Sequence, residues 1–125
     1  MHAYIIEDDY LIAQSLQDML ERQGFRTFSF ARSEDAAVMG AQAQKIDLIT
    51  ADVRLLPGDG MKAVEAICDK RAIPVVFITA FAEELQERNP DATVIQKPVK
   101  EEELAEAVRG AVGGMRSHPR EQTTK

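Results

Sequence analysis

Hydrophobic residues follow two different spacings along the chain, one typical of strands and the other of helices. Short segments in which every residue or every second residue is apolar predict five strands. These segments are residues 3–6, 25–30, 45–52, 75–79 and 93–96. Elsewhere apolar residues recur every three or four positions, which predicts five helices. The predicted helices cover residues 9–23, 34–44, 61–71, 80–88 and 100–112.

Residue types at the ends of these segments support the predicted helices. Asp9 and Ser33 belong to the types that cap a helix N-terminus, and Gly24 is a favourable residue just past a helix end. Pro90 disfavours helical backbone at Asn89, so the fourth helix must end there. We therefore expect a short or irregular fourth helix.

The regular alternation of strands and helices predicts the fold class. Short apolar strands separated by helices are typical of a parallel sheet with helices on both faces. Gly113 and Gly114 follow the last periodic segment, and residues 113–125 are polar and without hydrophobic periodicity. We therefore expect one domain, residues 1–112, and a flexible C-terminal tail, residues 113–125.

Composition and charge narrow the function classes. The chain has 125 residues, 45% of them hydrophobic and none in a run long enough for a membrane span. Its N-terminus lacks the features of a signal peptide, so we expect a cytoplasmic protein. With 15 Lys and Arg against 21 Asp and Glu, the net charge of −6 argues against a nucleic-acid partner. An acidic chain of this kind suits a bound cation or a basic protein surface.

Polar residues follow four of the predicted strands. Glu7 and Asp8 come after the first, Asp52 ends the third, Thr79 ends the fourth and Lys97 follows the fifth. Ligands bind at the carboxyl ends of strands in open parallel sheets, so these side chains are expected to meet at one edge. Crowded carboxylates bind a cation or take up protons, and oxygen ligands favour Mg²⁺. A lysine and a hydroxyl beside them suit a phosphoryl group, which Asp52 could accept as nucleophile.

The same segments resemble the response-regulator receiver domain over residues 2–112. The matching pieces are "IIED", "DLITADVRLLPGDG", "IPVVFITA" and "QKPV", in this order and at four strand ends. The resemblance implies a flavodoxin-like (βα)5 fold, a doubly wound parallel sheet with strand order 2-1-3-4-5.

The resemblance also implies a role for each site residue. Glu7, Asp8, Asp52 and the backbone carbonyl of Arg54 match the positions that bind Mg²⁺ in the family. Asp52 matches the phosphoacceptor of the family. Asp9 lies outside this set and is expected to cap the following helix.

Two further residues match positions that engage the phosphoryl group. Thr79 matches the switch hydroxyl, and Lys97 matches the lysine that pairs with the phosphoryl group. A cis bond between Lys97 and Pro98 is expected, which would direct the lysine inward.

Three features depart from the family pattern. Leu56 occupies the place where the loop after Asp52 usually has proline, and Pro57 follows it, so we expect an altered turn. Val94 stands where the family usually has a switch aromatic. The stretch from Thr79 to Lys97 is shorter than usual, which again indicates a short fourth helix and an altered output surface.

The function implied by the resemblance is a phosphorylation-switched signalling module. A sensor histidine kinase or a histidine phosphotransfer protein would donate the phosphoryl group to Asp52, with Mg²⁺ as cofactor. The chain would catalyse only its own phosphorylation and dephosphorylation and would act on no separate substrate. Since only a short tail follows the domain, we expect a stand-alone receiver that signals to a downstream protein, or a receiver taken from a longer chain.

Two other functions remain open. A pseudo-receiver would bind partners without phosphorylation. The intact set of acids, Thr79 and Lys97 argues against it, and Val94 and the short fourth helix keep it open. A small phosphatase of the haloacid dehalogenase type would also combine an aspartate nucleophile, Mg²⁺, threonine and lysine. That family needs a D-x-D motif after its first strand, a spacing that Asp8 and Asp9 do not provide.

Overall fold

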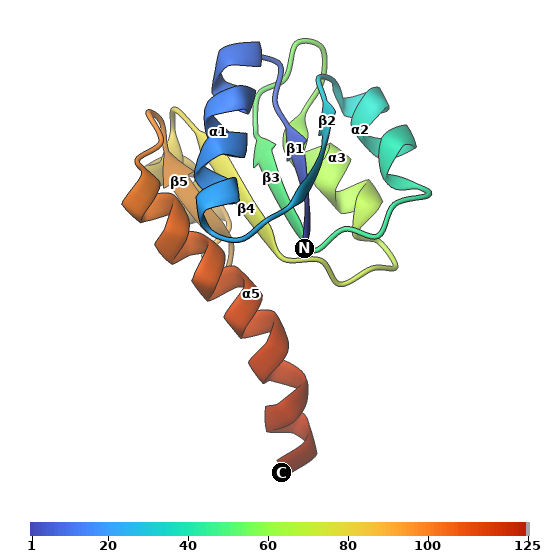
Figure 1. Cartoon of the computed structure of the whole chain (residues 1–125), viewed down its shortest axis with the longest axis vertical. Coiled ribbons are helices and arrows are strands. Elements are labelled where there is room, and N and C mark those ends of the chain that lie inside the picture. The colour runs from blue at the N-terminus through green and yellow to red at the C-terminus, as the bar shows by residue number, and fades with distance from the viewer. Residues whose placement is uncertain (125) are drawn as a thin grey trace.

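Five strands and five helices alternate along the chain, as the hydrophobic spacing predicts (Figure 1). The computed structural model describes the backbone of residues 1–124 and the side chains of residues 1–114. The strands are β1 (His2–Ile6), β2 (Thr27–Ala31), β3 (Leu48–Asp52), β4 (Val75–Thr79) and β5 (Thr93–Gln96). The helices are α1 (Tyr10–Arg22), α2 (Glu34–Ala41), α3 (Gly60–Ile67), α4 (Ala82–Arg88) and α5 (Glu101–Thr124).

All five strands pair in parallel in the order β2-β1-β3-β4-β5. This confirms the predicted flavodoxin-like α/β fold. The short fourth helix is also confirmed, because α4 ends at Arg88 and Asn89 follows as its C-terminal cap. Parallel pairing brings the carboxyl ends of all five strands to one edge of the sheet.

Helices cover both faces of the sheet and create two hydrophobic cores. On one face α1 and α5 contribute Leu16, Leu20 and Leu104, all at most 1% exposed. On the other face α2, α3 and α4 pack over side chains that include Tyr4 and Ile49. Successive residues of a strand point to opposite faces, which is why the central strands are apolar almost throughout.

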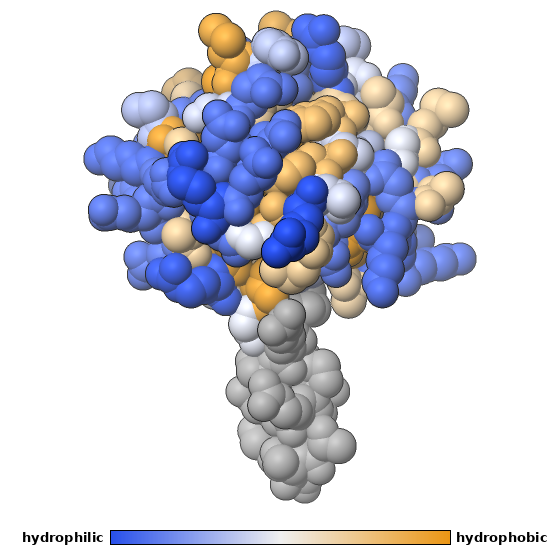
Figure 2. Space-filling view, in the orientation of Figure 1, coloured by the Kyte–Doolittle hydropathy of each residue, from blue (hydrophilic) through white to orange (hydrophobic). Residues whose placement is uncertain are grey.

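The strands of the sheet differ in how deeply they are buried. Every residue of β3 is buried, whereas β2 lies at the sheet edge and leaves Phe30 44% exposed. Figure 2 shows the corresponding apolar surface along β2, bordered by hydrophilic side chains. The carboxylates of the site described below therefore follow or end two buried strands, β1 and β3.

Several predicted element boundaries are wrong, among them the end of the second helix, at Ala41 rather than Gln44, and the start of the third strand, at Leu48 rather than Lys45. Two others show the physical reason. Phe25 was expected in the second strand, but its amide donates to the Leu20 carbonyl and its side chain, 2% exposed, fills the core from the turn after α1. The third helix ends at Ile67 rather than Arg71, which instead donates to the Ala41 and Gln44 carbonyls. In both places a residue beyond the end of the element has a tertiary role, Phe25 in the core and Arg71 in hydrogen bonds to another segment. The pattern in the sequence therefore continues past the end of the strand or helix.

The last helix is longer than predicted. It continues past Val112 to Thr124, and neither Gly113 nor Gly114 adopts the positive φ of a glycine cap. Glycine costs about 1 kcal/mol relative to alanine inside a helix, which weakens a helix without ending it. The boundary between a domain of residues 1–112 and a flexible tail of residues 113–125 stays a prediction.

Candidate functional site

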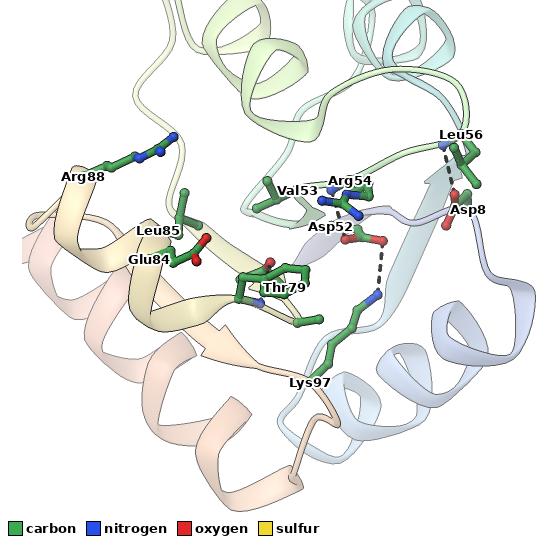
Figure 3. A pocket seen from close by; sticks show the side chains of 12 residues that line it. Asp8, Asp52, Val53, Arg54, Leu56, Thr79, Glu84, Leu85, Arg88 and Lys97 are labelled. Atoms are coloured by element: carbon green, nitrogen blue, oxygen red, sulfur yellow. Dashed lines mark hydrogen bonds and ion pairs between the residues drawn. The ribbon is translucent and has the colours of Figure 1, made fainter.

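The candidate site lies where β1, β3, β4 and β5 end. Glu7 and Asp8 follow β1, and Asp52 is the last residue of β3. Thr79 ends β4 and Lys97 follows β5 by one residue. Figure 3 shows Asp8, Asp52, Thr79 and Lys97 around one cavity, so the fold brings together the residues that the strand ends predict.

Three carboxylates form the centre of the site. Glu7, Asp8 and Asp52 each contribute an oxygen, and these oxygens all lie within 4.8 Å of one another. Glu7 is 3% exposed and Asp52 is 6% exposed, so water does little to reduce their repulsion. Such a cluster requires a cation or protons for stability.

Lys97 supplies one positive charge to this cluster. Its Nζ lies 3.1 Å from Asp52 Oδ2, to which it donates a hydrogen bond, and 3.5 Å from Glu7 Oε1. The backbone amide of Lys97 donates to the Thr79 carbonyl, which fixes the residue beside β4. The Lys97–Pro98 peptide bond is cis, as predicted.

Burial and charge together shift the ionisation of the site. Burial and the neighbouring Asp52 carboxylate raise the pKa of Glu7 to about 7, although the Asp9 amide and Lys97 act in the opposite direction. For Lys97, burial lowers the pKa, but the hydrogen bond to Asp52 and the charge of Glu7 outweigh it and raise the pKa overall. Lys97 therefore stays charged at neutral pH, whereas the Glu7 carboxylate is protonated in part of the molecules.

The carboxylate set fits a hard divalent cation. Although Lys97 is within ion-pair distance, Glu7 Oε1 is buried and has no hydrogen-bond partner among the described residues. A buried carboxylate oxygen that accepts no hydrogen bond, beside two others, provides the oxygen ligands that Mg²⁺ prefers. The arrangement of Glu7, Asp8 and Asp52 is thus suited to holding Mg²⁺.

Asp8 and Asp9 have separate tasks in the structure. Asp8 Oδ2 accepts a hydrogen bond of 2.9 Å from the Leu56 amide, which ties the end of β1 to the loop after β3. Asp9 caps α1 by accepting from the Leu11 and Ile12 amides, as predicted. Of the three consecutive acids, only Glu7 and Asp8 belong to the acidic cluster.

Thr79 places a hydroxyl in the cavity from the end of β4. The residue is 6% exposed, and its Oγ1 accepts a hydrogen bond of 3.1 Å from the Phe81 amide. Its hydroxyl proton is therefore available for a group inside the cavity.

The loop between β3 and α3 approaches Asp52 very closely. A Cβ at Gly60 would lie 1.8 Å from the Asp52 carbonyl oxygen, so only glycine fits there. Gly58 has φ of 113°, and its carbonyl accepts from the Leu55 amide to close the turn. Asp59, in the same loop, caps α3. The predicted change of turn is present as a cis bond between Leu56 and Pro57.

The cavity extends beyond the residues that the sequence pattern singles out. It has a volume of about 470 Å³ and also includes side chains from the ends of β3 and β4 and from α4. The Arg54 guanidinium lies 5.5 Å from the centre of the Phe81 ring, a cation–π contact across its mouth. Arg54 was expected to contribute only its carbonyl. Residues that line the cavity but were not predicted are Val53, Leu56, Ala80, Phe81, Glu84, Leu85 and Arg88.

Comparison with known families agrees with this geometry. Residues 3–109 match the family described as the response regulator receiver domain. The chain belongs to this receiver family. An acidic pocket at the carboxyl end of the sheet, formed by Glu7, Asp8 and Asp52, is therefore the acidic pocket of a receiver domain.

Several known receivers and their relatives are similar to the chain. The transcriptional regulatory protein PdtaR of Mycobacterium tuberculosis is 35% identical over 116 residues, which cover 90% of this chain and 57% of PdtaR. The crystal structure of the anti-anti-sigma factor PhyR from Bartonella quintana is 30% identical with a TM-score of 0.83, covering 98% of this chain and 51% of that one. The chain thus spans about half the length of these two relatives.

A third relative bears on the metal. The receiver domain of a sensor histidine kinase from Pseudomonas aeruginosa, crystallised with a magnesium ion in its active-site cleft, is 26% identical with a TM-score of 0.76. The match covers 90% of this chain and 97% of that domain. In the described part of our own chain, no helix is both long and apolar enough to span a membrane.

Proposed function

We propose that this receiver accepts a phosphoryl group on Asp52 and signals through a change in its protein contacts. The contact between Lys97 Nζ and Asp52 Oδ2, 3.1 Å long and inside the cluster of three carboxylates, carries the proposal. It joins a nucleophile, a charge that can hold phosphoryl oxygens and a set of metal ligands in one cavity.

Each residue has a definite part in the proposed reaction. An oxygen of Asp52 attacks the phosphorus of a phosphohistidine as the bond between phosphorus and imidazole nitrogen breaks, and the imidazole leaves with a proton. Lys97 holds a phosphoryl oxygen by charge, and the Thr79 hydroxyl donates a hydrogen bond to another.

Glu7, Asp8, Asp52 and the Arg54 carbonyl are the proposed ligands of Mg²⁺. When bound, Mg²⁺ neutralises the negative charge that builds up during transfer. The magnesium ion in the related Pseudomonas aeruginosa receiver supports this assignment.

The proposed partners follow from the reaction and from the relatives. A sensor histidine kinase or a histidine phosphotransfer protein supplies the phosphoryl group, and a downstream protein receives the signal. PhyR from Bartonella quintana is described as an anti-anti-sigma factor, which supports an output through protein contact. We expect a cytoplasmic chain that turns over no separate substrate and needs neither nucleic acid nor membrane.

Phosphorylation can be tested with the isolated chain. Acetyl phosphate with Mg²⁺ should add one phosphoryl group, detected by intact mass, and Asp52→Asn should abolish the addition. Beryllium fluoride with Mg²⁺ should shift backbone amide signals around Asp52, Thr79 and Lys97. A chain without added mass and without amide shifts would instead be a pseudo-receiver, and multiple turnovers of a phosphomonoester would indicate a phosphatase.

The Lys97→Ala variant tests whether Lys97 is needed for the switch. The side chain is partly exposed and its loss leaves the cores intact, so we expect a folded protein. Its amide shifts with beryllium fluoride should be lost at Thr79, because the charge that holds the phosphoryl mimic is gone. An unchanged response would remove Lys97 from the mechanism.

A further inference from the structure

The cavity extends from Asp52 into the space between the end of β3 and α4. We call this part of the cavity the basic lobe and define it by Val53, Arg54, Phe81, Leu85 and Arg88. In Figure 3 Asp8 lies to the right of Asp52 and Lys97 below it, whereas Glu84, Leu85 and Arg88 lie to its left. The two ends of the cavity therefore differ in their side chains.

Charge distinguishes the basic lobe from the acidic end. Among the described residues, no carboxylate lies within 4.0 Å of the Arg54 or Arg88 guanidinium, whereas Lys97 has two carboxylate partners. Glu84 also lines the cavity, which leaves two cations against one carboxylate in this part. Arg88 extends from α4 above Leu85 toward Val53 (Figure 3). The two guanidinium groups thus exceed the Glu84 carboxylate by one positive charge, and neither of them is held in an ion pair among the described residues.

The remaining surface of the basic lobe is apolar. Leu85 is 9% exposed and Val53 is half-buried, so both form a fixed floor. The Phe81 ring is 53% exposed and is held beneath Arg54 at 5.5 Å, which leaves a flat surface at the mouth. An apolar floor with a few converging polar groups is the usual composition of a small-molecule site.

The volume is also larger than the proposed phosphorylation requires. A cavity of about 470 Å³ lies within the range of roughly 300 to 1,000 Å³ that small-molecule sites occupy. A metal ion and a phosphoryl group on Asp52 would fill only the end next to Lys97 and Asp8. The basic lobe remains open in that arrangement.

We propose that the basic lobe binds a small organic anion, a carboxylate or phosphate carried on an aromatic or other apolar body. The charged group pairs with the Arg88 guanidinium, and the apolar body lies on Val53 and Leu85 toward the Phe81 ring, over which Arg54 stands. Guanidinium groups suit both anions, because their planar donors match carboxylate and phosphate oxygens. This inference does not depend on phosphorylation of Asp52.

Four probes separate the contributions of charge and apolar contact. The full chain, labelled with nitrogen-15 and kept in EDTA, is titrated with benzoate, phenyl phosphate, benzyl alcohol and inorganic phosphate. We expect benzoate or phenyl phosphate to shift the amides of Val53, Arg54, Leu85 and Arg88, and the tighter of the two identifies the preferred anion. Benzyl alcohol and inorganic phosphate should bind at least fivefold more weakly, because each lacks one half of the interaction.

Variants of Arg88 locate the site. Arg88→Ala should weaken the better probe at least fivefold, and Arg88→Lys should restore part of the affinity. Arg109→Ala, on the exposed side of α5 and outside the cavity lining, removes the same charge and should bind like the wild type. Equal affinity of Arg88→Ala and the wild type, or amide shifts confined to Asp8 and Lys97, would overturn the proposal. Acetyl phosphate labelling of the same proteins, after EDTA has been replaced by Mg²⁺, tests Asp52 separately, so failure of one proposal is distinguishable from failure of the other.

Discussion

Glu7 is the residue whose charge depends most on its surroundings. Its pKa rises from 4.5 to about 7 in the folded chain, so between these values the folded state binds a proton that the unfolded state does not. For the metal-free protein this contribution to stability is present below about pH 4.5 and is lost as the pH rises to about 7. At the proposed site Mg²⁺ and the proton would compete for the same carboxylate, so Mg²⁺ affinity should rise with pH.

Calorimetric titration of Mg²⁺ at several pH values measures this competition. Below pH 7 we expect the affinity to fall by about tenfold per pH unit, since binding displaces one proton. Glu7→Gln should bind Mg²⁺ weakly and with little pH dependence between 5 and 8. A wild-type affinity that stays constant over this range would contradict the raised pKa.

Thr50 is a second residue with an unusual environment. It lies within β3, is 1% exposed and has a hydroxyl without a hydrogen-bond partner in the described part of the chain. Valine has nearly the same shape and no polar group, so Thr50→Val should stabilise the fold by about 1 kcal/mol in urea unfolding. Thr50→Ser keeps the hydroxyl and removes a methyl group, and should destabilise it. A loss of stability in Thr50→Val would mean that the hydroxyl has a partner.

At the scale of elements, the loop between β3 and α3 controls the position of Asp52. The backbone of Gly60 lies against the Asp52 carbonyl, where an added Cβ would approach to 1.8 Å. Gly60→Ala should therefore displace the start of α3 and cost about 2 kcal/mol or more of folding free energy, measured by denaturant unfolding. Gly110→Ala, in α5 with open space around the glycine, is the matched control and should stabilise the helix slightly.

Some parts of the structure can be predicted from the sequence and others cannot. Residue type alone identifies the caps Asp9 and Ser33, because their side chains act on amides of their own helix. Strand ends identify Glu7, Asp52 and Lys97, because parallel strands all end at one edge. The contact of Arg54 with Phe81 depends on two loops that are distant in sequence, and no local pattern encodes it.

At the last helix a local signal in the sequence is misleading. Glycine at 113 and 114 lowers the intrinsic preference for helix, yet the backbone stays helical to Thr124. At the scale of the whole molecule, Figure 1 shows these last turns extending away from the sheet. The core contacts of α5 come from earlier residues, among them Leu104 and Val108.

Truncation tests whether residues 1–112 form the complete domain. A chain that ends at Val112 keeps Leu104 and Val108, so we expect its free energy of unfolding to lie within about 0.5 kcal/mol of the full chain. Urea unfolding of the two chains measures the difference. A loss of more than about 2 kcal/mol would mean that the segment after Val112 packs on the domain.

The charges of the acidic cluster also set the kind of ion that the whole molecule can accept. Three carboxylates and one ammonium carry a net charge of −2 when all are ionised, so a divalent ion makes the site electroneutral. A monovalent ion would leave it negative, and a trivalent ion would leave it positive inside a poorly screened interior. Lys97 thus determines which ion charge fits the site. It balances one of the three negative charges, and a cation taken up from solvent must balance the remaining two.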